Sequence, residues 1–263
     1  MHGTIEDVIV LRDVMVPMRD GVRLATDVTL PARAGDALPG PFPTLLYRTP
    51  YDKGAARLSE VTAADPAPQS NLQVAADLAR AGYAVINQDC RGRYGSEGVF
   101  CKYIGEGADG FDTLDWVRAQ PWCDGTFGTF GLSYSAHVQT ALAALRPKGL
   151  KAMFLDSGGF WNGYQGGIRH RGAFEMKQVT WACKHARLSD AARDPAVAAA
   201  MDAEDIGAWI LGKRWQRGTS PMRHVPAYED YLFDQWERTD FDAYWQHPDL
   251  YFAPLYDLSL IHI

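Results

Sequence analysis

The sequence predicts an α/β fold with a mainly parallel sheet, because strand-like and helix-like segments alternate up to about Gly158. Five apolar segments have the composition of buried strands: Arg23 to Leu30, Pro43 to Pro50, Tyr83 to Cys90, Gly125 to Leu132 and Lys151 to Gly158. Helical patterns over 71–82, 107–122 and 135–145 separate the later strands. Apolar strands joined by helices form a sheet that is covered on both faces. We expect the earliest strands to pair antiparallel at one edge of this sheet.

The pattern changes after Gly158, where glycine and tryptophan become frequent. Helical stretches follow over 174–188, 194–215 and 227–238, and no strand-like run returns before about Leu250. We interpret 158–249 as a helical cap over a substrate pocket, inserted after a core of 1–157. Helical packing without a cap function is the alternative. Residues 250–257 begin the return to the core.

Composition excludes several classes of protein. The 263 residues are 47% hydrophobic, enough for a sizeable core, and the net charge of -6 argues against a nucleic-acid partner. The N-terminus lacks a signal-peptide pattern, and no apolar stretch of about 18 residues occurs. We therefore expect a cytoplasmic protein with no membrane contact. Cysteine spacing matches no metal site or disulfide framework, so we expect free thiols and neither metal nor cofactor; the cysteines are Cys90, Cys101, Cys123 and Cys183.

The motif Gly131-Leu132-Ser133-Tyr134-Ser135-Ala136 lies where an apolar strand ends and a helix begins. A serine on such a sharp turn is exposed above the sheet, and the close packing there requires small residues on either side, here Gly131 and Ser135. The amide of Tyr134, at the start of the helix, would face negative charge on a substrate oxygen. Ser133 is therefore a candidate nucleophile. The alternative is that Ser133 only caps the helix.

Four segments, the last of which contains this motif, resemble the cocaine esterase and Xaa-Pro dipeptidyl-peptidase-like family of serine hydrolases, which have the α/β-hydrolase fold. They are VPMRDGVRLATDVTLP, RTPYDK, NQDCRGRYGSEG and DGFDTLDWVRAQPWCDGTFGTFGLSYSA, and the resemblance extends from about Val14 to Tyr256. Ser135 departs from the residues usual in the family's turn. The resemblance implies an α/β-hydrolase core with a helical cap, truncated before its last strands.

The resemblance also implies roles for single residues. Ser133 would be the nucleophile, and Tyr51 would complete an oxyanion hole with the amide of Tyr134. Tyr51 follows a strand end, where α/β sheets bind ligands, and a phenol donates one hydrogen bond. Packing on a neighbouring loop is the alternative for Tyr51. Asp89 and Arg91 also follow a strand end, and we interpret them as an architectural pair.

No residue of the 263-residue sequence is a convincing catalytic acid or base. In this fold the triad follows the order serine, acid, histidine, and the resemblance places the acid and the histidine beyond residue 263. We interpret the histidines as terminal, surface or cap residues: His2, His137, His170, His185, His224, His247 and His262. The tail LSLIHI, Leu258 to Ile263, continues no pattern and is interpreted as an assembly artefact.

The sequence thus predicts a serine hydrolase that cleaves a small acyl ester, an amide or a short peptide through an acyl-enzyme. Xaa-Pro dipeptidyl-peptidase activity is one alternative, and it requires carboxylates that bind a free amino terminus. The cap offers several, although the same spacings fit solvated helix faces: Asp202, Glu204, Asp205, Glu229 and Asp230. A non-catalytic binding domain of the same fold is the other alternative.

Overall fold

The computed structural model describes residues 5–56, 66–67, 69–212, 215–252 and 254. The chain divides into two compact units. The first comprises Met1–Gly98 and Glu106–Gly159, and the second comprises Val99–Gly105 and Phe160–Ile263. The tail that we interpret as an artefact lies outside the described residues.

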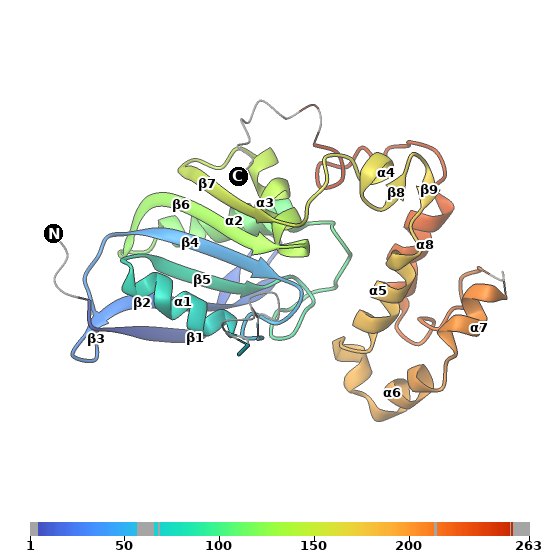
Figure 1. The fold of residues 1–263 in the computed structure, drawn as a ribbon, viewed down its shortest axis with the longest axis horizontal. Coiled ribbons are helices and arrows are strands. Elements are labelled where there is room, and N and C mark those ends of the chain that lie inside the picture. The colour runs from blue at the N-terminus through green and yellow to red at the C-terminus, as the bar shows by residue number, and fades with distance from the viewer. Residues whose placement is uncertain (1–4, 57–65, 68, 213–214, 253, 255–263) are drawn as a thin grey trace. The chain divides into compact units, whose positions relative to one another are not determined.

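A sheet forms the centre of the first unit (Figure 1). Its strands follow the order β1-β2-β5-β4-β6-β7, and the short β3 pairs with β2. Neighbours among β5, β4, β6 and β7 are parallel, whereas β1 and β5 are both antiparallel to β2. The predicted mainly parallel sheet with an antiparallel edge is confirmed. The strand bounds are β1 Asp7–Pro17, β2 Arg23–Arg33, β3 Asp36–Ala37, β4 Phe42–Thr49, β5 Ala84–Asp89, β6 Cys123–Leu132 and β7 Leu150–Asp156.

Helices cover both faces of the sheet, as two neighbouring residues of β5 illustrate. Val85 packs with Ala75 of α1, whereas Ile86 packs with Leu114 of α2 and Leu142 of α3. Successive side chains of a strand point to opposite faces, so α1 lies on one face and α2 and α3 lie on the other (Figure 1). The helix bounds are α1 Asn71–Arg80, α2 Glu106–Arg118 and α3 Tyr134–Ala144.

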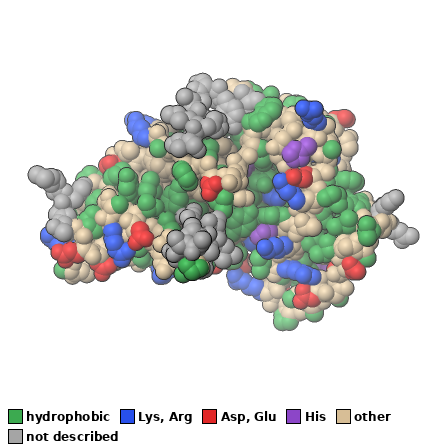
Figure 2. All heavy atoms as spheres, viewed as in Figure 1, with side chains coloured by type: hydrophobic (Ala, Val, Ile, Leu, Met, Phe, Trp, Pro, Cys, Tyr) green, Lys and Arg blue, Asp and Glu red, His purple; other side chains and the backbone are tan. Residues whose placement is uncertain are grey.

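The strand β7 lies at the end of the sheet opposite β1. Within the described ranges it pairs with β6 alone, and its Phe154 side chain is 67% exposed. On the face drawn in Figure 2, hydrophobic side chains gather over the part of the first unit that carries the strands. An edge strand with exposed apolar groups offers a surface for a further strand or chain segment.

The second unit is mostly helical. One predicted stretch, 194–215, forms two helices instead of one, because the Asp205 side chain accepts a hydrogen bond from the amide of Ala208 and starts a new helix there. A short hairpin of β8 and β9 also occurs where the sequence predicted no strand. No described helix has the length and apolar character needed to cross a membrane. The role of this unit as a cap stays a prediction. The element bounds are α4 Gly163–Gly166, β8 Arg169–His170, β9 Ala173–Phe174, α5 Lys177–Ala186, η2 Asp190–Arg193, α6 Pro195–Asp202, α7 Ile206–Leu211 and α8 Pro226–Glu237.

The segment Val99–Gly105, which leads from β5 towards α2, packs within the second unit. The Lys102 Nζ donates to Gln178 Oε1 at 2.7 Å and lies 3.9 Å from the ring centroid of Trp181. Burial lowers the pKa of Lys102 well below its usual value. The amide of Gly105 donates to Asp249 Oδ2 at 2.6 Å, so polar contacts attach both parts of the segment.

Candidate active site

Ser133 occupies the turn between β6 and α3. Its φ of 59° and ψ of -116° lie in a region that residues other than glycine rarely adopt. The Ser133 amide donates to the carbonyl of Asp156 at 2.9 Å, which keeps the turn attached to β7. The residue is exposed. Ser133 therefore stands on a strained strand-to-helix turn, and its role as nucleophile stays a prediction.

Close backbone packing fixes the shape of this turn. A Cβ added at Gly131 would lie 2.5 Å from the Cβ of Ser135. A Cβ added at Gly158 would lie 2.2 Å from the carbonyl oxygen of Ser133. Protein interiors do not accommodate such approaches without displacement of the backbone. The turn therefore requires glycine at both positions, while Ser135 still fits, almost fully buried.

The geometry does not support the interpretation of Ser133 as a helix cap. Within the part of the chain that the structure describes, the Ser133 side chain makes no capping hydrogen bond to α3. The Ser133 carbonyl instead accepts hydrogen bonds from the amides of Ala136 at 3.0 Å and His137 at 3.2 Å. The backbone of Ser133 thus starts the helix, and its hydroxyl is not used for this.

Tyr51 lies two residues beyond the end of β4, which is adjacent to β6 in the sheet. Because β4 and β6 are parallel, Tyr51 and Ser133 both follow the carboxyl ends of neighbouring strands. The rings of Tyr51 and Tyr134 are in edge contact, with centroids 6.3 Å apart and an interplanar angle of 78°. The structure therefore brings Ser133, Tyr134 and Tyr51 to the same edge of the sheet.

Buried polar side chains hold the backbone on both sides of Tyr51. The Nε of Arg93 donates to the carbonyl of Pro50 at 2.9 Å. The amide of Lys53 donates to Asp89 Oδ1 at 2.7 Å. Arg93 and Asp89 are both almost fully buried, so the two contacts are shielded from water. Side chains from the end of β5 and from the loop after it thus determine the path of the Tyr51 loop.

The Asp89 carboxyl group has an unusual environment. Burial raises its pKa to about 7, although hydrogen bonds from the amides of Lys53 and Gly95 and the charge of Lys53 oppose this shift. Its protonation state therefore changes near neutral pH, next to the loop that carries Tyr51.

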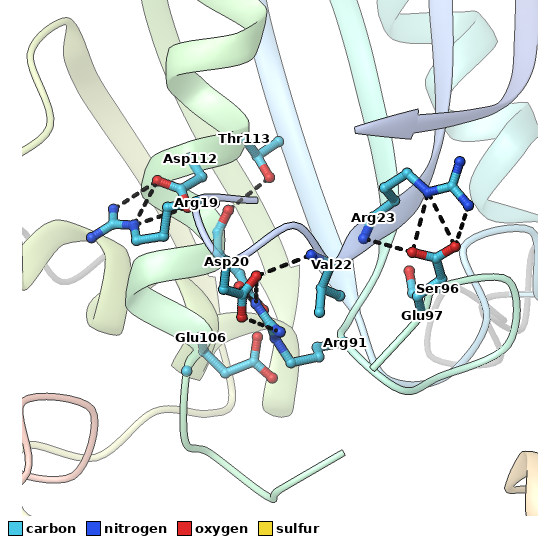
Figure 3. Close-up of polar contacts among 12 residues, drawn as sticks. Arg19, Asp20, Val22, Arg23, Arg91, Ser96, Glu97, Glu106, Asp112 and Thr113 are labelled. Carbon is cyan, nitrogen blue, oxygen red and sulfur yellow. Dashed lines mark hydrogen bonds and ion pairs between the residues drawn. The ribbon is translucent and has the colours of Figure 1, made fainter. Parts of the chain in front are cut away.

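Arg91 pairs with Asp109 and Asp20 and not with Asp89. We expected a pair between Asp89 and Arg91, but Arg91 Nη2 donates to Asp109 Oδ1 at 2.6 Å and Arg91 Nη1 donates to Asp20 Oδ2 at 2.7 Å. Figure 3 shows the Arg91 side chain directed at Asp20. The expectation was wrong because neighbours in a loop need not face each other, and Arg91 reaches other elements.

A buried charged cluster that the sequence did not single out contacts Tyr134. The Tyr134 hydroxyl donates to Glu106 Oε1 at 2.8 Å. Glu106 Oε2 lies 3.1 Å from Arg48 Nη2, and the Glu106 carbonyl accepts from Arg48 Nη1 at 2.7 Å. All three side chains are 4% exposed or less. Glu106 stands in the first turn of α2, where an acidic residue is usually solvated, so the sequence gives no signal of this contact.

The described histidines have local contacts. His137 is buried in α3 of the first unit, so its interpretation as a surface or cap residue was wrong. Its ring centroid lies 6.0 Å from that of Tyr134. The other described histidines belong to the second unit and contact residues there: His170 with Glu175, His185 with Trp181, His224 with Glu204 and His247 with Asp249. His2 and His262 lie outside the described residues. In the same described ranges, no group of three or more His, Cys, Asp or Glu side chains could hold a metal ion.

One protein-family model matches most of the chain. The family model described as X-Pro dipeptidyl-peptidase (S15 family) matches residues 20–254, a range that includes Tyr51, Ser133 and Tyr134. The chain belongs to the S15 family. The resemblance inferred from the sequence motifs is therefore confirmed at the level of the family.

Relatives of this S15 family chain are hydrolases. The chain is 45% identical over 144 residues to cocaine esterase from Rhodococcus sp. (strain MB1 Bresler). The matched region covers 55% of this chain and 23% of that protein. An α-amino acid ester hydrolase structure has a TM-score of 0.61 at 24% identity and covers 97% of this chain and 41% of that one. A CocE/NonD family hydrolase from Staphylococcus aureus has a TM-score of 0.60 at 21% identity, with coverage of 92% and 38%. The chain thus spans less than half the length of each of these proteins, and the two structures support the fold.

Proposed function

We propose that this protein is a serine hydrolase that cleaves acyl ester or amide bonds through an acyl-enzyme. The Ser133 oxygen attacks the acyl carbonyl carbon, the alcohol or amine leaves with a proton, and water then releases the acyl group as an acid. One observation carries the proposal: the exposed Ser133 lies on a strained turn that directly precedes the first amide of α3. A nucleophile and a hydrogen-bond donor are thereby adjacent.

We propose that the amide of Tyr134 and the hydroxyl of Tyr51 stabilise the oxyanion. The first amides of a helix point out of its N-terminal end and favour negative charge there. The contact between the Tyr51 and Tyr134 rings supports a shared position at the edge of the sheet. A pair of fixed donors of this kind is typical of acyl transfer.

We propose that the acid and the histidine of the triad lie beyond residue 263. In this fold both follow the serine in the sequence, and the matched 144 residues cover only 23% of the length of cocaine esterase. Serine is a weak nucleophile without a base, so the 263-residue chain by itself should have little or no turnover.

We favour an esterase over an Xaa-Pro dipeptidase, and the partners of the second unit's carboxylates are compatible with this choice, although Asp202 and Asp230 are 71% and 67% exposed. Recognition of a free amino terminus needs carboxylates that are available to the substrate. All five candidates already have partners in their own unit: Asp202 with Arg187, Glu204 with Arg223 and His224, Asp205 with the amide of Ala208, Glu229 with Ser220, and Asp230 with Arg217. The similarity to cocaine esterase supports the same choice.

The proposal is tested by p-nitrophenol release from short-chain esters, measured with the full-length protein and with the 263-residue chain. We expect turnover by the full-length protein that Ser133→Ala abolishes, and none by the 263-residue chain. Turnover by the short chain that Ser133→Ala removes would overturn the placement of the acid and base. A full-length protein without turnover on esters, amides or peptides would favour the non-catalytic binding domain.

A second comparison separates the two hydrolase activities. Esters with and without a free α-amino group should react with similar kcat/KM if the protein is an esterase. A strong preference for the α-amino substrate, together with cleavage after an Xaa-Pro dipeptide, would favour the dipeptidase.

A further inference from the structure

Glu106 connects the two chain segments that carry the proposed oxyanion donors. Glu106 Oε1 accepts the hydrogen bond of the Tyr134 hydroxyl, and the amide of Tyr134 is one of the two proposed oxyanion donors. Glu106 Oε2 lies 3.1 Å from Arg48 Nη2, and Arg48 stands on β4 three residues before Tyr51. One carboxylate thus contacts a residue of each segment.

The Arg48 side chain is itself fixed. Its Nε donates to Gln88 Oε1 at 2.8 Å, and Gln88 also accepts a hydrogen bond from the hydroxyl of Thr113. Burial opposes the charge of Arg48, but the carboxylates of Glu106 and Asp109 outweigh this and raise the pKa of Arg48. Arg48 therefore stays charged, and Glu106 has a rigid cationic partner.

Stability alone is a weak reason for such a cluster. Moving two charges out of water costs several kcal/mol per ion, and apolar residues of similar volume often stabilise a core as well or better. Loss of one partner of a buried pair is costly, because the other charge stays buried and unpaired, so each partner is held close to the other. The carboxylate of Glu106 also receives the phenol of Tyr134, whose backbone immediately follows Ser133.

We propose that Glu106 is a positioning residue that holds the amide of Tyr134 and, through Arg48 and the contact of the tyrosine rings, the Tyr51 loop in the geometry of the oxyanion hole. This inference rests on the proposed function. Glu106 does not touch the substrate; it sets the distance between two donors. Small displacements are costly in such a site, since a misplacement of about 1 Å can lower the rate by about 10²-fold.

The test uses the full-length protein and p-nitrophenyl butyrate. Tyr134→Phe keeps the ring and removes only the hydroxyl, and we expect kcat to fall by about 10- to 100-fold while KM changes by less than about threefold. Glu106→Gln keeps an acceptor for the Tyr134 hydroxyl and should retain more activity than Glu106→Ala. Asp112→Asn is the matched control, because Asp112 is an acidic residue of the same helix α2 whose arginine partner is Arg19. It should leave kcat unchanged.

A double-mutant cycle separates positioning from a purely structural role. If Glu106 and Tyr134 act through the oxyanion hole, Tyr134→Phe and Tyr51→Phe disturb the same group of donors. The double variant should then lose less kcat than the product of the two single fold-losses. The inference would be overturned if the double variant's fold-loss in kcat equals the product of the two single losses, or if Tyr134→Phe has a kcat within twofold of the parent. Both measurements apply even if Glu106→Ala fails to fold. Ser133→Ala distinguishes the two levels: if it keeps full turnover, the proposed function and this inference fail together. If it abolishes turnover while Tyr134→Phe is normal, only the inference fails.

Discussion

The turn that carries Ser133 and the loop that carries Tyr51 lie at the same sheet edge but are held in different ways. Backbone atoms hold the turn, through the close approaches at Gly131 and Gly158 and the hydrogen bond to Asp156. Buried charged side chains hold the loop, through Arg93 and Asp89. The turn should therefore be the more sensitive of the two to added volume, and the loop should be the more sensitive to pH.

The largest effect is expected from added volume at the turn. Gly158→Ala places a Cβ 2.2 Å from the Ser133 carbonyl oxygen, so the nucleophile and the Tyr134 amide must move together. We expect kcat/KM for an ester to fall by about 10³-fold or more at every pH. Gly166→Ala is the control, because a Cβ there meets nothing within 4 Å. Equal activity of both variants would show that backbone packing does not fix the turn.

Removal of one donor from the loop should have the next largest effect. Tyr51→Phe keeps the ring contact with Tyr134 and removes the hydroxyl, and loss of one oxyanion donor typically lowers kcat by about 10²- to 10³-fold. Tyr83→Phe, a half-buried tyrosine packed near α1, serves as control and should keep the parent rate. An unchanged rate for Tyr51→Phe would remove Tyr51 from the mechanism.

The pH dependence of stability tests the role of charge in the loop. Burial raises the folded-state pKa of Asp89 to about 7, above its ordinary value of 3.8, so the folded protein binds a proton that the unfolded chain has lost. The free energy of unfolding should therefore fall as the pH rises from about 4 to about 7, by at most about 4 kcal/mol for this group. Urea unfolding at pH 5 and pH 8 should show a smaller decrease in Asp89→Asn than in the parent. The same decrease in both would mean that Asp89 titrates normally.

The smallest effect is expected at the surface pair of Arg19 and Asp112, whose side chains face each other in Figure 3. The Arg19 Nη2 and Asp112 Oδ1 atoms lie 2.7 Å apart. Arg19 is 59% exposed, and exposed ion pairs contribute less than about 1 kcal/mol. Arg19→Ala should therefore change the free energy of unfolding by less than about 1 kcal/mol in the same urea measurement, with kcat unchanged. A larger loss would show that surface pairs also hold this end of the sheet.

The sequence was informative where structure depends on local pattern. The strands that later became β2, β4, β5, β6 and β7 were predicted because apolar, β-rich runs alternate with helical ones. The first strand, β1, was missed, because its pairing with β2 is interrupted by a register shift between Leu11 and Val14 and by Asp13 at a φ of 51°. A bulge of this kind breaks the alternation that identifies a strand.

Some residues of the candidate site were predicted from the sequence, and others were missed. Ser133 and Tyr134 follow from a short motif, and Tyr51 from its place after a strand together with the family resemblance. Glu106 and Arg48 were missed, because they lie 58 residues apart and only the fold brings them together. The partner of Asp89 was likewise decided by tertiary packing, since Lys53 comes from another loop. Long-range contacts between charged side chains leave no periodic signal in one sequence.

The most direct test of the account is labelling with a fluorophosphonate, which forms a covalent bond with activated serines. The full-length protein and its Ser133→Ala variant would be treated, digested and analysed by mass spectrometry. We expect the label on the peptide that contains Ser133 and none on the variant. A label on another serine, or equal labelling of the Ser133→Ala protein, would contradict the assignment of Ser133 as the nucleophile.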